Sequence, residues 1–116
     1  MKKILIIDDE PHIVKMVESR LKMNDYEVVS AFNGREGLNK VHDETPDLII
    51  LDVMMPKMDG YTFVRELKKE KNETPVIVLT AKTGMADLFE MEGVVAYIQK
   101  PFETEDLLKI ISRALQ

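Results

Sequence analysis

Two hydrophobic periods alternate along this chain, and that alternation restricts the fold more than any other feature of the sequence. Short apolar runs, of the kind buried on both faces of a parallel sheet, occur at Ile4–Ile7, Val28–Val29, Leu48–Leu51, Val76–Leu79 and Val94–Ile98. Amphipathic segments with the helical period follow them, at Pro11–Asn24, Arg35–Asp43, Tyr61–Lys71, Met85–Met91 and Thr104–Leu115. The sequence therefore predicts an α/β fold, a single doubly wound (βα)5 domain whose five-stranded parallel sheet carries helices on both faces.

Length and composition narrow the class of protein further. The 116 residues fit one domain, residues 1–116, and an apolar fraction of 45% suits a globule with a real core. The formal charge of −5 argues against direct binding to nucleic acid. The absence of cysteine excludes a disulfide scaffold, a thiolate zinc site and a cysteine nucleophile. No membrane span or secretory signal is visible, so we expect a cytoplasmic protein without a membrane partner.

Polar residues gather where the expected strands end. Ligands of open α/β sheets bind beyond the carboxyl ends of the strands, and the residues at these ends are Asp8, Asp9, Glu10, Asp52, Thr80 and Lys100. Each has a simpler explanation when taken alone. An acid before Pro11 is a typical helix start, and Thr80 and Lys100 also suit a turn and a solvated surface.

Taken together, these residue types favour chemistry. Three carboxylates at one edge of a sheet repel one another and need a cation, and their oxygens suit a hard octahedral ion such as Mg²⁺. A hydroxyl and an ammonium nearby can bind an anion that sits on that metal. An aspartate nucleophile with these neighbours is what formation of an aspartyl phosphate requires. We therefore expect Asp52, at the end of a buried run, to be a reactive carboxylate.

Four segments also match a known family in order and in approximate spacing: "ILIIDDE", "PDLIILDVMMPKMDG", "PVIVLTA" and "YIQKPF". Through them the sequence resembles, over essentially its whole length, the response-regulator receiver domain of two-component signal transduction. The resemblance implies a chemotaxis-regulator-like fold with the strand order 2-1-3-4-5. It also implies a switch that a histidine kinase or phosphotransfer protein phosphorylates, with an effector that the sequence does not name.

The resemblance assigns the metal site and the acceptor. Asp52 accepts the phosphoryl group, and Asp9 and Asp52 bind Mg²⁺ (or Mn²⁺) directly. The backbone carbonyl of Met54 helps them, while Asp8 acts largely through water. No other cofactor is implied.

The resemblance also assigns the switch residues. Lys100 contacts the phosphoryl oxygens, Thr80 follows them when the domain switches, and Tyr97 is the aromatic residue whose rotamer reports activation. Pro101 is expected to follow a cis peptide bond.

A stripe on the first helix is the expected docking surface for the kinase. His12, Met16, Ser19 and Met23 follow the spacing i, i+4, i+7, i+11, opposite the apolar stripe that begins at Val14. Family members commonly offer this helix to the kinase, and methionine adapts well to another helix surface. The alternative is that these methionines are incidental exposed residues.

One region departs from the family pattern. The interval from Thr80 to Lys100 is a residue or two shorter than expected, so we expect a short or partly melted fourth helix. Val94, Val95 and Ala96 replace a segment that is usually more polar. Their simplest interpretation is an extension of the fifth strand.

Two other function classes use the same residues. A metal-dependent phosphatase or phosphotransferase can also use an aspartate nucleophile, but haloacid-dehalogenase-like enzymes carry a second acid two positions later, where this chain has Met54. A docking module without phosphorylation would not need the acids, the hydroxyl and the lysine. We therefore expect a signalling domain and not an enzyme. We expect a monomer, with dimerisation on phosphorylation left open.

Overall fold

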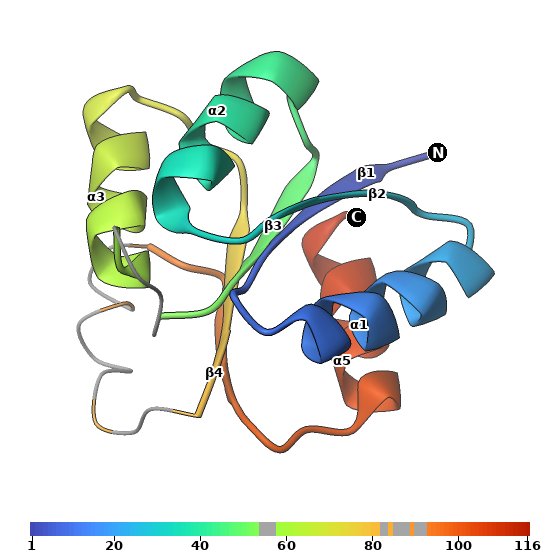
Figure 1. Ribbon diagram of the computed structural model, residues 1–116. Coiled ribbons are helices and arrows are strands. Elements are labelled where there is room, and N and C mark those ends of the chain that lie inside the picture. The colour runs from blue at the N-terminus through green and yellow to red at the C-terminus, as the bar shows by residue number, and fades with distance from the viewer. Residues whose placement is uncertain (54–57, 82–83, 85–88, 90–92) are drawn as a thin grey trace.

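In the computed structural model, five parallel strands form one sheet in the order β2-β1-β3-β4-β5 (Figure 1). The structure describes residues 1–53, 58–81, 84, 89 and 93–116. The strands are β1 (Lys3–Ile7), β2 (Glu27–Ala31), β3 (Leu48–Leu51), β4 (Val76–Thr80) and β5 (Ala96–Gln99). The predicted α/β class and strand order are both confirmed.

Helices follow the strands, and those that lie between two strands make the crossovers that parallel pairing requires. The helices of the described ranges are α1 (Pro11–Met23), α2 (Gly34–Glu44), α3 (Gly60–Lys69) and α5 (Thr104–Ala114), and α5 follows the last strand. The helix expected over Met85–Met91 lies outside the described residues, except for Phe89. Among the helices of the described ranges, none combines the length and the apolar character that crossing a bilayer demands.

Local sequence explains where two of these helices begin. The side chain of Asn33 accepts a hydrogen bond of 2.8 Å from the backbone N–H of Glu36, which caps α2. The side chain of Asp59 does the same for α3, accepting 2.8 Å from the N–H of Thr62. Such caps satisfy backbone donors that the first helical turn leaves without partners.

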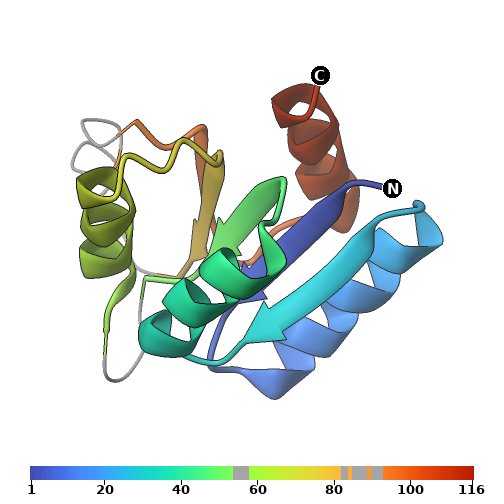
Figure 2. The ribbon, with the colours of Figure 1, turned by 90° about the horizontal axis from the view of Figure 1, so that it is seen from above.

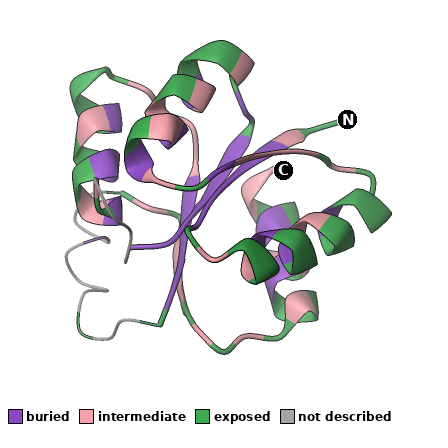
Figure 3. Cartoon of the chain, viewed as in Figure 1, coloured by how far each residue is buried: buried purple, intermediate pink, exposed green. Residues whose placement is uncertain are grey.

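The sheet separates two apolar cores (Figures 2 and 3). Alternate strand residues point to opposite faces, so neighbours such as Leu5 and Ile6 enter different cores. One core contains Phe63 and Leu67 of α3 and is covered by α2 and α3. The other is covered by α1 and α5, through Val14, Val17, Leu21, Leu107 and Ile111.

The fifth strand is shorter at its start than the sequence suggests, so the expected extension through Val94 and Val95 is wrong. Gly93 has a φ of +79°, and the N–H of Val94 bonds back to the carbonyl of Phe89 at 3.3 Å. Val94 therefore cannot also donate to the sheet. The N–H of Val95 bonds to Val76 at 2.8 Å, but the Val95 side chain stays 49% exposed and regular pairing starts at Ala96.

Candidate functional site

Backbone hydrogen bonds extend the sheet one residue beyond three of its strands and so fix the candidate site. The N–H of Asp8 donates to Ala31 at 3.1 Å, and the N–H of Asp52 donates to Ile7 at 2.9 Å. The N–H of Lys100 donates to the carbonyl of Thr80 at 2.8 Å. The functional side chains thus leave rigid backbone at the carboxyl edge of the sheet, where the sequence places them.

The ammonium of Lys100 lies among three carboxylates from two segments of the chain. Its Nζ is 3.0 Å from Oδ2 of Asp8, 3.4 Å from Oε1 of Glu10 and 3.6 Å from Oδ2 of Asp52. The first two contacts are hydrogen bonds. Lys100 is therefore not the solvated surface lysine of the simpler interpretation, because its side chain is only 11% exposed.

Burial makes this cluster electrostatically costly. Asp8 and Asp52 are 3% and 4% exposed, and Thr80 is fully buried. Burial raises the pKa of Asp8, although the hydrogen bond from the backbone N–H of Glu10 and the Lys100 ammonium act in the opposite direction. Burial alone would lower the pKa of Lys100, but its hydrogen bond to Asp8 and the charges of the three carboxylates raise it instead. The neighbouring carboxylates therefore favour the charged form of Lys100.

The acids can hold a cation. One carboxylate oxygen from each of Asp8, Asp9, Glu10 and Asp52 lies within 4.8 Å of the others. An all-oxygen carboxylate set suits a hard divalent ion such as Mg²⁺ and disfavours the soft metals that prefer thiolate. The residues present therefore fit the metal that the sequence suggests. The expected contribution of the Met54 carbonyl lies outside the described residues.

The expected switch residues occupy neighbouring strands beside the site. Thr80 and Tyr97 lie on β4 and β5, which pair directly. Burial, and to a smaller extent the charge of Asp52, raise the pKa of the half-buried Tyr97 phenol. Its centroid is 5.8 Å from that of Phe89, whose centroid is 5.6 Å from that of Tyr61 on α3. Tyr97 therefore belongs to an aromatic cluster that joins β5 to α3.

Other expectations concern the surface and the backbone. The stripe of His12, Met16, Ser19 and Met23 is exposed along α1, while the opposite face of this helix is buried. Met16 and Met23 are 42% and 74% exposed. The peptide bond between Lys100 and Pro101 is cis.

The sequence places Glu10 among the acids at the strand ends but gives its side chain no contact of its own. Glu10 is the N-cap residue of α1, yet its side chain makes no capping hydrogen bond. It contacts Lys100 instead, and the run of three consecutive acids was the available signal. The sequence gives no sign that Gly60 matters here, yet a Cβ at this position would lie 2.8 Å from both the Asp52 carbonyl oxygen and the Val53 Cα. No local pattern reveals such a close approach.

The fold and the site together define a signalling receiver. The family model described as the response regulator receiver domain matches residues 4–112. The chain belongs to this family.

Two curated relatives indicate the broader setting. The chain is 46% identical over 108 residues to the "Probable transcriptional regulator ycf27" of Guillardia theta, a match that covers 91% of this chain and 42% of that protein. It is 41% identical to the "Alkaline phosphatase synthesis transcriptional regulatory protein PhoP" of Bacillus subtilis, over 91% of this chain and 45% of that protein. The chain thus spans less than half the length of these relatives.

A solved structure supports the fold. The response regulator TrrA of Thermotoga maritima, in complex with Mg(2+)-BeF, superposes with a TM-score of 0.91 at 33% identity. The match covers 99% of this chain and 100% of that chain.

Proposed function

We propose that this chain is a phosphorylation-dependent switch whose phosphoryl acceptor is Asp52. The observation that carries the proposal is the placement of a buried carboxylate on rigid backbone, with an ammonium 3.6 Å away. In the proposed reaction an oxygen of Asp52 forms a bond to phosphorus. The bond from phosphorus to the donor's imidazole nitrogen breaks, and that nitrogen keeps the electron pair.

The chain's own residues supply orientation and charge. Lys100 donates to the phosphoryl oxygens and offsets their negative charge, and the hydroxyl of Thr80 donates once its loop has moved toward them. Asp9 and Asp52 are the proposed direct ligands of Mg²⁺ or Mn²⁺, together with the Met54 carbonyl, and Asp8 binds through water. The bound cation would offset the charge that gathers on the phosphoryl oxygens.

The proposed conformational change follows from the same contacts. Phosphorylation adds about −1.5 to −2 charges beside Thr80 and Lys100. Tyr97 then turns toward the space that Thr80 leaves, and this rearrangement alters the face that partners recognise. NMR shifts of Thr80 and Tyr97 on addition of a phosphoryl mimic test the switch, and unchanged shifts would contradict it.

The proposed donor is a histidine kinase or a phosphotransfer protein that docks on the His12, Met16, Ser19 and Met23 stripe. Support comes from the exposure of the two methionines, which lie on a helix adjoining the site. Met16→Glu combined with Ser19→Glu should slow transfer from a kinase that phosphorylates the wild-type chain. Labelling by acetyl phosphate should be unaffected, and equal loss of both reactions would refute docking at this stripe.

The downstream effector is not identified by the chain. Because the curated relatives are named as transcriptional regulators, we propose that the receiver controls transcription within a longer cytoplasmic regulator. The receiver itself would not contact nucleic acid or membrane. It would be a monomer, and light scattering before and after phosphorylation tests whether it then dimerises.

Acetyl phosphate provides the central test. Wild-type protein incubated with acetyl phosphate and Mg²⁺ should gain one phosphoryl group by intact-protein mass spectrometry. Asp52→Asn should remove the adduct, whereas Asp43→Asn, at an exposed position of α2, should retain it. An undiminished adduct in Asp52→Asn would refute the assignment of Asp52 as the phosphoryl acceptor. Continuous turnover of many phosphate esters would indicate the enzyme class instead, and no reaction at all would indicate a docking module.

A further inference from the structure

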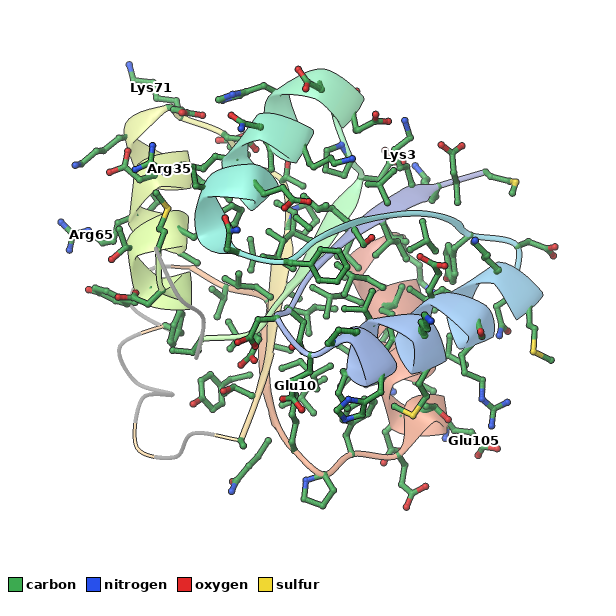
Figure 4. All side chains as sticks on the ribbon, viewed as in Figure 1. Lys3, Glu10, Arg35, Arg65, Lys71 and Glu105 are labelled. Carbon is green, nitrogen blue, oxygen red and sulfur yellow. The ribbon has the colours of Figure 1, made fainter. Side chains whose placement is uncertain are left out.

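Glu10 is the one acid of the cluster without a role in the proposed reaction, and its side chain is held by neighbours on two elements. Oε1 lies 3.4 Å from Nζ of Lys100, and Oε2 lies 3.5 Å from Nε2 of His12. The side chain makes no capping hydrogen bond to α1, so helix formation does not explain its position. Figure 4 labels Glu10 at the start of α1, far along β1 from Lys3.

The position of the Lys100 ammonium suggests what Glu10 does. Its two hydrogen bonds go to Asp8 and Glu10, both of which follow β1, whereas Asp52 at 3.6 Å receives no hydrogen bond from it. In the resting arrangement the ammonium is thus drawn toward the β1 side of the site. A phosphoryl group on Asp52 requires the ammonium to turn toward β3.

The two resting partners differ in how easily they release Lys100. Asp8 is 3% exposed, and its second oxygen accepts the backbone N–H of Glu10 at 3.0 Å, so it is fixed. The Glu10 side chain is 46% exposed and can turn into water. The contact between Glu10 and Lys100 is therefore the one that yields when a phosphoryl group arrives.

We propose that Glu10 is a positioning residue that competes with the phosphoryl group for the Lys100 ammonium. This inference rests on the proposed phosphorylation of Asp52. By holding Lys100 in the resting arrangement, Glu10 favours the unphosphorylated state and lowers the affinity of the site for a phosphoryl group.

Beryllofluoride, a mimic of the phosphoryl group, tests the proposal at saturating Mg²⁺. Glu10→Gln removes the charge, and Glu10→Asp keeps the charge but is one methylene too short to reach Lys100. Both variants should bind beryllofluoride roughly two- to fivefold more tightly than wild type, the range expected for losing a half-exposed charged contact. Glu18→Gln makes the same charge change on α1, where Glu18 pairs with Lys22, and should bind as wild type does.

The NMR signal of the Lys100 side chain is a second readout, which a merely structural role would not move. In the free proteins this signal should shift in both Glu10 variants and stay unchanged in Glu18→Gln. Circular dichroism confirms that each variant is folded, and a separate Mg²⁺ titration shows that the metal is saturating.

The other outcomes overturn the proposal in distinguishable ways. Tighter binding by Glu10→Gln alone would mean that only the long-range field of the charge matters. Equal or weaker binding of beryllofluoride by both variants would mean that Glu10 does not compete for Lys100. If the whole effect were a lower affinity for Mg²⁺, Glu10 would be a ligand of the cation. A wild-type chain that binds no beryllofluoride would overturn the proposed function together with this inference. Equal affinities in wild type and variants would overturn the inference alone.

Discussion

Replacing Lys100 with methionine should destabilise the protein strongly in the absence of divalent metal and much less in its presence. Methionine preserves most of the side chain's apolar volume but removes the ammonium. Asp8 and Asp52 then stay 3% and 4% exposed without the cation that lies 3.0 Å and 3.6 Å from them. The Lys100 ammonium then no longer offsets their mutual repulsion.

The magnitude follows from burial. Removing one partner of a fully buried ion pair costs roughly 3–5 kcal/mol. The Lys100 side chain is 11% exposed and Glu10 is half exposed, so water screens part of the effect. We therefore expect a loss of about 2–3 kcal/mol, which for a domain of this size lowers the melting temperature by roughly 8–12 °C.

The loss should also depend on pH. Burial raises the folded-state pKa of Asp8 above its ordinary value of 3.8, so the folded state binds a proton more readily than the unfolded state does. Charging Asp8 therefore costs stability as pH rises from the unfolded pKa through the folded pKa. Without Lys100 this cost grows, so the variant should lose less stability at acid pH than at neutral pH.

Thermal unfolding followed by circular dichroism, in EDTA and in Mg²⁺, measures these effects. Lys109→Met replaces an exposed lysine of α5 and should change stability by no more than about 0.5 kcal/mol. Mg²⁺ should restore much of the loss in Lys100→Met, because it supplies positive charge to the same carboxylates. If Lys100→Met were as stable as Lys109→Met in EDTA, or if Mg²⁺ did not narrow the difference, the electrostatic argument would be refuted.

Three further outcomes can be measured on the same protein. Removing Mg²⁺ with EDTA should lower the melting temperature of the wild type, because bound ion stabilises the folded state by about 2.7 kcal/mol at a hundredfold its dissociation constant. An unchanged melting temperature would argue against a metal site. Gly60→Ala should cost more than about 1 kcal/mol in urea unfolding, because its Cβ would lie 2.8 Å from the backbone of Asp52 and Val53. The pKa of Lys100 is raised above 10.5 in the folded state, so its stabilising contribution is fully present below that pH and disappears as pH rises through the folded pKa. The difference in unfolding free energy between wild type and Lys100→Met should therefore become smaller at alkaline pH.

Much of this architecture was predictable because it depends on local signals. Runs such as Leu48–Leu51 are apolar at every position, which is typical of a strand covered on both faces. The strand ends then follow, and with them the positions of Asp8, Asp52, Thr80 and Lys100. Parallel strands bring their carboxyl ends to one edge, so residues far apart in sequence could be placed together without knowing any distance.

The features that escaped prediction depend on particular contacts that local residue patterns do not encode. Val94 has strong strand propensity, but its N–H bonds to the carbonyl of Phe89, and residue propensity does not predict this hydrogen bond. Glu10 looks like a helix cap in sequence, and only the ammonium at position 100 explains where its carboxylate lies. The need for glycine at position 60 arises from the backbone of another segment.

The division of the interior by the sheet has a consequence for protein engineering. Val14, Val17 and Leu21 of α1 share one apolar core with Leu107 and Ile111 of α5, while the side chains under α2 and α3 belong to the other core. A chimera that takes α1 from another family member should therefore take α5 from the same donor, so that the side chains of the two helices keep their packing against each other. The recipient's α2 and α3 need no redesign, because the described side chains packed beneath them belong to the other core. Exchanging α1 and α5 together could in this way change which kinase the receiver recognises.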